Sequence, residues 1–105
     1  MDNYNAVKIF SALAQELRLK ILKRLVKTGD DGLCPCHLVE EFEMTNANLS
    51  FHLKELESAG LVEKERRGKF IHYRAKCDVI KKLGDFLIED CSKLNCSKNK
   101  ECNDA

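Results

Sequence analysis

In the first part of the chain, apolar residues recur every three or four positions, the period that gathers side chains on one face of an α-helix. One such stretch covers residues 5–14 and a second covers residues 17–26. The second stretch runs into the loop 28–32, which contains two glycines. Glycine readily adopts the left-handed conformation that ends a helix. We therefore predict two helices followed by a loop.

Two shorter helices are predicted next. The third begins near Cys34, because Pro35 suits the first turn of a helix, and it ends at a turn around 43–44. A fourth helix extends from Thr45, a typical N-cap residue, to about Ala59. Its buried stripe is expected to consist of Leu49, Leu53 and Leu56.

The period changes after Gly60. Residues 61–66 and 70–75 are expected to be strands joined by a turn at 67–69, a β-hairpin. A last helix is predicted from an N-cap at Asp78. This order of elements is that of a winged helix-turn-helix, a mainly α-helical domain with a small β-hairpin. We expect the domain to cover residues 1–90 and a flexible, cysteine-bearing tail to cover residues 91–105.

The composition narrows the class of protein. A chain of 105 residues with 44% hydrophobic and 33% charged residues is typical of one folded domain, too small for a multi-domain enzyme. No apolar run approaches the roughly 20 residues of a membrane-spanning helix. The first residues lack the basic and apolar segments of a secretory signal, so we expect a cytoplasmic protein with no membrane partner.

Charge is distributed unevenly, although the formal net charge is only +1. Residues 61–76, which include the predicted hairpin, hold six cations and two anions and so carry a local net charge of +4. Binding to nucleic acid requires a basic face and not a basic protein as a whole. The predicted hairpin therefore supplies a candidate basic face.

In a winged helix-turn-helix, the second helix of the motif places its N-terminal residues against base edges in the major groove. The residues expected to contact DNA from that helix are Thr45, Asn46, Ala47, Asn48, Ser50, Phe51, His52 and Lys54. Asparagine and serine can bind bases, alanine or phenylalanine can contact a thymine methyl group, and lysine suits phosphate. His52 has two interpretations, a DNA contact or a partly buried structural histidine.

The hairpin residues Arg66, Arg67 and Lys69 are expected at the phosphate backbone or in the adjacent minor groove. Such contacts supply affinity and salt dependence but little sequence choice. A single polar or basic surface residue is most often only solvated. The prediction therefore depends on the ordered combination of short helix, turn, amphipathic helix and basic hairpin.

Six cysteines are many for this length. In a compartment that keeps thiols reduced, they bind metal or sense redox state more often than they form structural disulfides. Cys34 and Cys36 lie at the start of the third helix, where the helix N-terminus is expected to lower a thiol pKa and to favour the thiolate. Thiolates select soft or borderline metals.

A second cluster, Cys91, Cys96 and Cys102, lies in the predicted tail. Three thiolates on one segment suit a three-coordinate ion such as trivalent arsenic or antimony. Zinc or cadmium requires four ligands, two from each cluster. Cys77 has no cysteine near it in sequence, and we expect it to be a small buried hydrophobic residue.

Several of these segments resemble the ArsR–SmtB winged-helix repressors. The resemblance covers roughly residues 5–88 and includes an opening block, 12–19, a recognition-helix signature, 49–56 with 59–62, and a wing, 67–74. It implies a homodimer with the first and last helices at the interface. It also implies a partly palindromic operator and release from DNA when a metal or metalloid binds.

The cysteines fit two arsenic-responsive branches of that family. Residues 33–38 resemble the arsenic-site segment of one branch, but Val39 stands where that branch has a third cysteine. Another branch carries its thiols in a C-terminal extension, as Cys91, Cys96 and Cys102 do here. The aspartate and histidine pattern of the branch that binds zinc on the last helix is absent.

The combined prediction is a dimeric repressor of arsenic-resistance genes that binds double-stranded operator DNA. Trivalent arsenic or antimony would release it by binding three cysteines, from the pair at 34 and 36 or from the tail. The alternatives are the same fold sensing zinc or cadmium, sensing oxidation through a disulfide, or holding a structural zinc ion. A thiol enzyme that uses His37 is disfavoured, because no motif supplies an oxyanion site or a substrate pocket.

Overall fold

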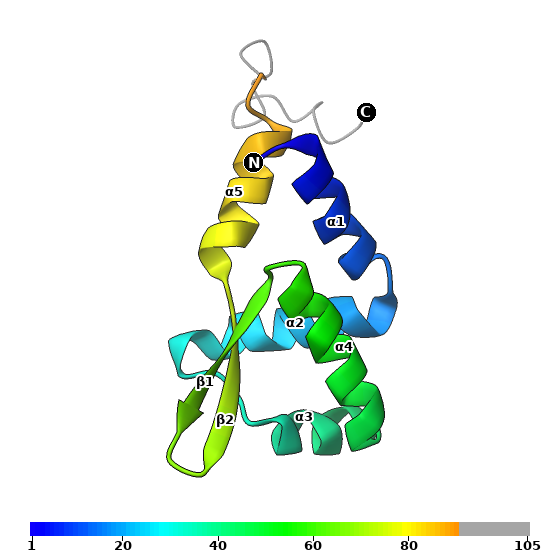
Figure 1. Ribbon diagram of the computed structural model, residues 1–105, viewed down its shortest axis with the longest axis vertical. Coiled ribbons are helices and arrows are strands. Elements are labelled where there is room, and N and C mark those ends of the chain that lie inside the picture. Colours follow the sequence, from blue (N-terminus) through cyan, green and yellow to red (C-terminus); the bar gives the residue numbers. More distant parts are fainter. Residues whose placement is uncertain (91–105) are drawn as a thin grey trace, which may run out of the picture.

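The computed structural model describes residues 1–90, and within this range the chain forms five α-helices and one two-stranded antiparallel sheet (Figure 1). The elements are α1 (Asn3–Leu13), α2 (Glu16–Thr28), a 3-10 turn η1 (Gly29–Asp31), α3 (Pro35–Phe42), α4 (Asn46–Ser58), β1 (Val62–Arg67), β2 (Phe70–Ala75) and α5 (Cys77–Leu87). This order confirms the predicted succession of four helices, a hairpin and a last helix.

The helix ends test the individual predictions. Thr45 is the N-cap of α4, since its Oγ1 accepts a hydrogen bond from the backbone N–H of Asn48 at 3.1 Å. Gly29 ends α2 with a φ of 83°, as expected for a C-terminal glycine. The predicted N-cap at Asp78 is wrong, because α5 begins at Cys77. Asp78 lies in the first turn instead, where a carboxylate is favourable beside the positive end of the helix dipole.

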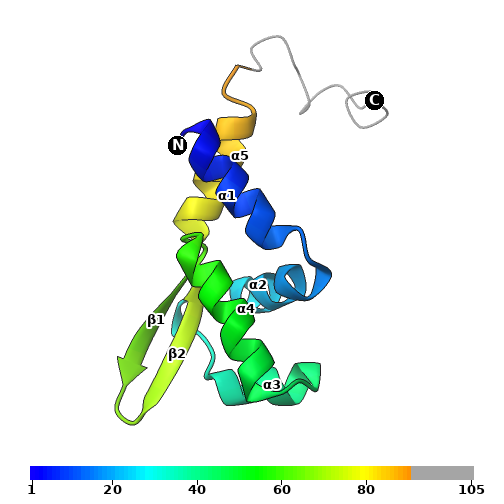
Figure 2. The same ribbon diagram turned by 45° about the vertical axis from the view of Figure 1, so that its right-hand side comes forward.

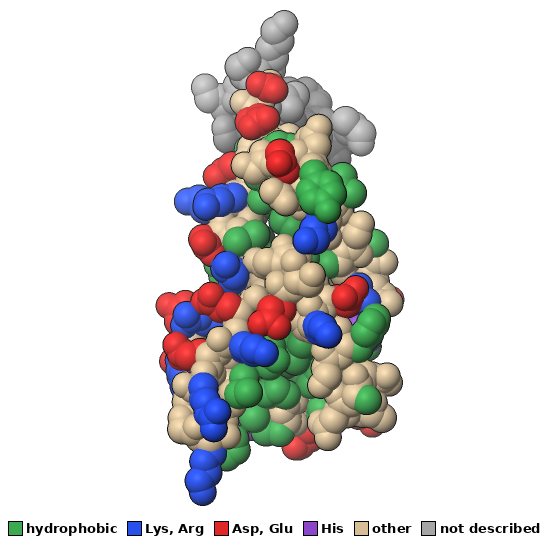
Figure 3. Space-filling view, in the orientation of Figure 1, with side chains coloured by type: hydrophobic (Ala, Val, Ile, Leu, Met, Phe, Trp, Pro, Cys, Tyr) green, Lys and Arg blue, Asp and Glu red, His purple; other side chains and the backbone are tan. Residues whose placement is uncertain are grey.

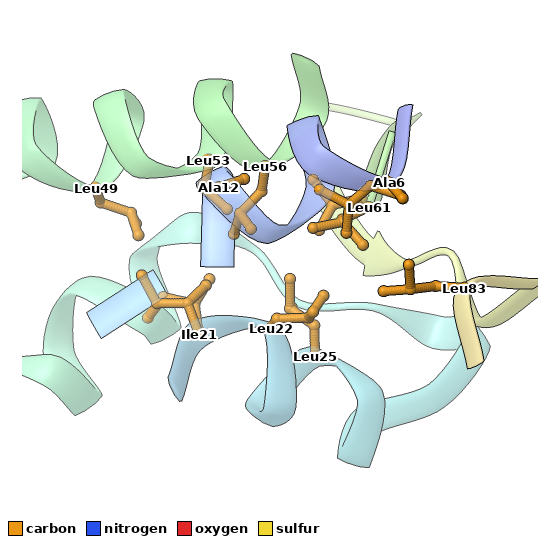
Figure 4. Packing of buried hydrophobic residues seen from close by; sticks show 13 residues of the cluster. Ala6, Ala12, Ile21, Leu22, Leu25, Leu49, Leu53, Leu56, Leu61 and Leu83 are labelled. Atoms are coloured by element: carbon orange, nitrogen blue, oxygen red, sulfur yellow. The ribbon is translucent and has the colours of Figure 1, made fainter. Parts of the chain in front are cut away.

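The centre of the hydrophobic core lies between α2 and α4, and buried residues of α1, α3, the start of the hairpin and α5 complete it (Figure 4). The predicted stripe of α4, Leu49, Leu53 and Leu56, is buried and faces Ile21, Leu22 and Leu25 of α2. Leu38 of α3 is also fully buried. Burial of each such side chain contributes about 1.5–3 kcal/mol. The core therefore fixes the position of α4 relative to α2 and α3.

The hairpin is tighter than predicted. Arg67 pairs with Phe70, so the turn consists of Gly68 and Lys69 alone and Arg67 is the last residue of β1. Gly68 has a φ of 63°, which glycine adopts without strain. Leu33, in the loop before α3, forms an isolated antiparallel bridge with Tyr73 of β2. That bridge attaches the hairpin to the body of the domain.

The elements divide between two ends of the molecule (Figures 1 and 2). Helices α1 and α5 lie side by side at one end. The tip of the hairpin, α3 and the N-terminal end of α4 lie at the other. In residues 1–90, no helix combines the length and apolar character needed to cross a bilayer.

Candidate DNA-binding surface and cysteine pair

The turn between α3 and α4 consists of residues 43–45. Glu43 has a left-handed backbone with a φ of 49°, and the N–H of Met44 donates to the carbonyl of Val39 at 3.2 Å. These features end α3 and redirect the chain, and Thr45 then caps α4. The two helices are thus joined as in a helix-turn-helix, with α4 in the position of the recognition helix.

Seven of the eight α4 residues predicted to contact DNA are solvent-exposed: Thr45, Asn46, Ala47, Asn48, Ser50, Phe51 and Lys54. Leu49 and Leu53, which alternate with them at helical spacing, are buried. The side of α4 away from the core therefore carries two amides, two hydroxyl groups, an exposed aromatic ring and a lysine. Donors, acceptors and apolar groups of this kind are those that contact base edges and phosphates.

His52 is the exception, because it is only half-exposed and is held by a residue of α2. Nδ1 of His52 accepts a hydrogen bond from Nε of Arg18 at 3.1 Å. Burial, and then the charge of Arg18, lower the pKa of His52 below its ordinary value. The side chain therefore has the structural contact foreseen as one of its two interpretations.

Arg18 is the functional candidate that sequence reasoning missed. It is only 8% exposed, the one charged residue of the described range that is buried. Its guanidinium carbon lies 5.3 Å from the ring centroid of Phe51, within reach of a cation–π interaction. The opening block 12–19 contains this arginine, but the sequence gives no sign of a contact 34 positions away with His52.

The hairpin presents its basic residues at the free end, where Figure 3 shows lysine and arginine side chains gathered. Arg66, Arg67 and Lys69 are all exposed, as a contact with the DNA backbone requires. Arg67 forms an ion pair with Glu65 at 2.7 Å, and Arg66 donates to the carbonyl of Gly68 at 3.3 Å. Lys69 has no ion-pair partner within residues 1–90. The cation at the turn is thus free for an external anion.

Carboxylates of the hairpin hold its arginines in place. The hydrogen bond from Arg67 and its charge lower the pKa of Glu65. Across the two strands, Nε of Arg74 lies 2.7 Å from Oε1 of Glu63, and this contact raises the pKa of Arg74. These pairs offset part of the local positive charge and leave the net positive charge at the tip.

The structure brings Cys34 and Cys36 together. Cys34 is the N-cap of α3 and Cys36 lies in its first turn. The Cys36 thiol donates a hydrogen bond to Sγ of Cys34, with a sulfur–sulfur distance of 3.1 Å. That hydrogen bond, followed by desolvation, raises the pKa of Cys36. The expectation that the helix N-terminus would favour the thiolate is therefore wrong for Cys36.

The described residues place two thiols at this position and no third potential ligand beside them. Among residues 1–90, no three histidine, cysteine, aspartate or glutamate side chains are close enough to hold one ion. Cys77 is exposed, so the expectation that it is buried is wrong. The predicted ligands Cys91, Cys96 and Cys102 lie outside the described residues.

Comparisons with known proteins agree with this geometry. Residues 15–64 match the family described as bacterial regulatory protein, arsR family. The chain is 44% identical over 64 residues to the arsenical resistance operon repressor of Bacillus subtilis, a match that covers 61% of this chain and 59% of that repressor. It is 36% identical over 75 residues to the cadmium resistance transcriptional regulatory protein CadC of Listeria innocua, covering 71% of this chain and 61% of that one.

Solved structures give the same result for the fold. An ArsR-like transcriptional regulator from Rhodococcus sp. RHA1 superposes with a TM-score of 0.75 at 27% identity, over 86% of this chain and 82% of that one. The homodimeric winged helix-turn-helix DNA-binding domain of a possible ArsR-family regulator from Mycobacterium bovis has a TM-score of 0.67 at 28% identity, over 80% and 76% of the two chains.

A further relative is similar along nearly its whole length. This is an uncharacterized HTH-type transcriptional regulator of Bacillus subtilis, 32% identical over 93 residues, a match that covers 77% of this chain and 93% of that regulator. With its fold and these matches, the chain belongs to the bacterial ArsR family of winged helix-turn-helix transcriptional regulators, which are DNA-binding proteins and not enzymes.

Proposed function

We propose that the protein is a dimeric transcriptional repressor that binds operator DNA in the cytoplasm and releases it when trivalent arsenic, or antimony, binds to its cysteine thiolates. The observation that carries this proposal is the Cys34–Cys36 pair, whose sulfur atoms are 3.1 Å apart at the start of the helix that precedes α4. A match to an arsenical resistance operon repressor supports the choice of metalloid.

DNA binding is assigned to the end of the molecule that carries the hairpin tip and the start of α4. Asn46 and Ser50 would contact base edges, because their amide and hydroxyl groups can both donate and accept hydrogen bonds. Lys54, together with the free cation Lys69, would contact phosphates. The hairpin tip and the N-terminal end of α4 lie at the same end of the molecule, so one duplex can contact both (Figure 1).

Two contacts link the cysteine pair to these surfaces. Leu38 of α3 packs in the same core as Leu49 and Leu53 of α4. On the other side, Leu33 directly precedes Cys34 and is bonded to Tyr73 of the hairpin. An ion that moves Cys34 therefore acts on both DNA-binding elements. For release, the ion has to bind the DNA-free arrangement more tightly than the DNA-bound one. The usual difference in binding free energy is about 1–3 kcal/mol.

The pair supplies two of the three sulfur atoms that trivalent arsenic takes. We propose that the third comes from Cys91, Cys96 or Cys102, on the same chain or on a second copy. A site built from all three tail cysteines is the competing arrangement. The two arrangements differ in which substitution abolishes the response.

Dimer formation is assigned to α1 and α5. Four large apolar side chains of these helices are exposed at the end of the molecule away from the hairpin tip: Tyr4 (75%), Val7 (60%), Phe10 (43%) and Leu87 (59%). An exposed apolar patch of this kind marks an interaction site on a small domain. A second copy that covers it would place two α4 helices on one palindromic operator. The homodimeric Mycobacterium bovis domain supports the formation of a dimer.

The test is a titration of arsenite into the reduced, full-length protein bound to a fluorescent duplex. The duplex is selected from a randomised pool by binding to the wild-type protein, and release is followed by anisotropy. We expect wild-type protein to be released. Cys34→Ser/Cys36→Ser protein should stay bound if the pair is required, and Cys91→Ser/Cys96→Ser/Cys102→Ser protein should stay bound if the tail is required. Failure of arsenite to release wild-type protein contradicts the proposal.

A second candidate function is sensing of another thiophilic metal or of oxidants on the same fold. The match to a cadmium resistance regulator favours the metal, and the contact between two thiols favours a disulfide. Release by cadmium or zinc but not by arsenite would select the first. Release by peroxide, reversed by a dithiol reductant, would select the second.

A further inference from the structure

Arg18 is a buried cation without a carboxylate partner among the described residues. It is 8% exposed, and no ion pair within residues 1–90 includes it. A cation removed from water has to be compensated by other polar groups. Its partners are neutral: Nδ1 of His52 at 3.1 Å, the carbonyl of Ala12 at 3.5 Å and the face of the Phe51 ring. Two of these three partners belong to α4.

The contact with His52 determines which nitrogen of the imidazole carries hydrogen. The guanidinium is always protonated and has no acceptor atom, so Nε of Arg18 is the donor. Nδ1 of His52 therefore has to offer its lone pair. A neutral imidazole with an unprotonated Nδ1 carries its hydrogen on Nε2. The buried arginine thus selects one tautomer.

The other ring nitrogen of His52 is available to a ligand. Nε2 has no hydrogen-bond partner in residues 1–90. No buried side-chain nitrogen or oxygen of the described residues lacks a partner, so Nε2 is accessible to solvent. His52 lies between the exposed residues Phe51 and Lys54 in sequence, in the helix assigned to DNA. An N–H at this place can donate to a phosphate oxygen or to a purine N7.

We propose that Arg18 is a positioning residue of the DNA-binding surface, which holds His52 as the Nε2–H tautomer so that this N–H donates a hydrogen bond to an acceptor on the operator. The inference rests on the proposed role of α4 as the DNA-contacting helix. In this arrangement His52 is both a structural histidine and a DNA contact, because one ring nitrogen bonds to Arg18 and the other binds DNA.

The charges around the pair favour the neutral ring. A protonated His52 would lose its acceptor at Nδ1 and would face Arg18 of α2 as a second cation. Lys8 of α1 and Glu55 of α4 line the same 170 Å³ hollow as Arg18. Their charges are opposite, so together they add no net charge beside the pair. The pKa of His52 is lowered accordingly, by burial first and by Arg18 second. Near neutral pH the ring is therefore uncharged and acts as a directed donor, not as a cation.

The first part of the test uses the free, full-length protein and nitrogen NMR of the histidine side chains. We expect wild-type His52 to show a protonated Nε2 and an unprotonated Nδ1, with titration below the ordinary value of about 6.5. Arg18→Met removes the donor and the charge, so both tautomers should appear and the pKa should rise. Ile21→Val changes the same helix without touching the pair and should leave both readouts unchanged. Wild-type protein with a mixed tautomer overturns the proposal.

The second part measures affinity for the selected duplex with two substitutions of the histidine. In His52→Asn, the amide oxygen can still accept from Arg18, but no donor remains at the position of Nε2. We expect affinity about tenfold lower or more, because one hydrogen bond is lost in each protomer of the proposed dimer. His52→Gln keeps an N–H donor near that position and should recover most of the affinity. Equal affinity of wild-type and His52→Asn protein overturns the DNA contact.

Further readouts separate this proposal from others. The salt dependence of binding should be the same for wild-type and His52→Asn protein, since a neutral histidine releases no counterion. A flatter slope would show that His52 acts as a cation and would overturn the tautomer mechanism. Duplexes with 7-deazapurines or with methylphosphonates distinguish a purine N7 from a phosphate as acceptor. If α4 does not bind DNA, Asn46→Ala and Lys54→Ala also leave affinity unchanged, which identifies a failure of the proposed function instead.

Discussion

Leu33 and Tyr73 exchange two backbone hydrogen bonds, with N–O distances of 2.9 and 2.8 Å. The two residues are 40 positions apart, and their bridge joins the loop before the cysteine pair to the inner strand of the hairpin. A third contact, from Nδ1 of His72 to the carbonyl of Asp31 at 3.2 Å, lies beside it. The hairpin is therefore attached to the same segment that begins α3.

Gly32 is required for that attachment. Its φ is 69°, and a Cβ atom at this position would lie 2.6 Å from the carbonyl oxygen of Tyr73. Gly29 also has a positive φ, of 83°, but open space around it. We expect Gly29→Ala to lower the free energy of unfolding by about 1–3 kcal/mol through backbone strain alone. Gly32→Ala should cost at least about 1 kcal/mol more, because backbone atoms have to move. Urea unfolding measures both, and equal losses would contradict the steric explanation.

The cap of α4 gives a second prediction. Thr45→Ala removes the acceptor for the N–H of Asn48 and should lower the free energy of unfolding by about 1 kcal/mol. Thr45→Ser keeps the hydroxyl group and should restore most of that loss. Thermal unfolding of the three proteins is the measurement. A serine variant as unstable as the alanine variant would mean that the methyl group of Thr45, and not its hydrogen bond, is what stabilises the helix.

Base contacts and phosphate contacts should respond differently to mutation. Lys69→Ala should weaken binding to all duplexes alike and reduce the salt slope by about two, one for each protomer of the proposed dimer. Asn46→Ala should change the preferred sequence and leave the salt slope unchanged, because an amide releases no counterion. Lys81, an exposed lysine of α5 at the other end of the molecule, supplies the control Lys81→Ala. If Lys69→Ala and Lys81→Ala have the same effect on affinity and on the salt slope, the assignment of the hairpin tip to phosphate contacts is wrong.

The thiol pair gives a prediction about reactivity. The hydrogen bond to Cys34 raises the pKa of Cys36. At a given pH, a smaller fraction of Cys36 is therefore thiolate than in a cysteine without this contact. Cys34→Ala removes the acceptor, which should lower the pKa of Cys36 and speed its alkylation by iodoacetamide near pH 8. The rate is measured by mass spectrometry of the peptide that contains Cys36, with exposed Cys77 as the internal reference. A rate that does not change shows that the pair does not share a proton.

The assembly of two copies is tested on α1. Val7→Asp places a carboxylate on the exposed apolar surface assigned to the dimer interface, and burial of an unpaired charge there is unfavourable. We expect sedimentation to show monomers at micromolar concentrations at which wild-type protein is dimeric. Val26→Asp is the matched control, since Val26 is also exposed but lies on α2. Dissociation by both substitutions, or by neither, would contradict an interface at α1.

The elements of the fold were predictable because each depends on neighbours in sequence. The spacing of Leu49, Leu53 and Leu56 and the cap at Thr45 are local signals, and both predictions are confirmed. The start of α5 was not, because a long-range contact decides it. The N–H of Lys76 donates to the carbonyl of Leu61 at 2.8 Å, so the chain stays in extended pairing up to that residue and the helix begins at the next one.

For the candidate site as well, local features could be predicted from the sequence and long-range contacts could not. The exposure of the α4 residues follows from helical geometry. The proximity of Cys34 and Cys36 does not, because residues two apart within a helix do not face each other. The two thiols meet because Cys34 is the N-cap, with an extended backbone, and only Cys36 lies within α3. The direction of the Cys36 pKa shift was mispredicted, since a specific hydrogen bond outweighs the general effect of a helix N-terminus. The contact between Arg18 and His52 depends on how α2 packs against α4, which one sequence does not specify.

The bridge between Leu33 and Tyr73 also has a consequence for the solubility of the protein. Leu33 pairs with the edge of β2 that faces away from β1. Within residues 1–90, the outer edge of β1 is therefore the longer strand edge without a partner. Five consecutive charged residues, 63–67, occupy that strand. Charged side chains on an edge strand discourage pairing with the edge of another molecule. The residues that give the hairpin its charge thus also protect a DNA-binding protein with an exposed strand from forming intermolecular sheets and aggregates.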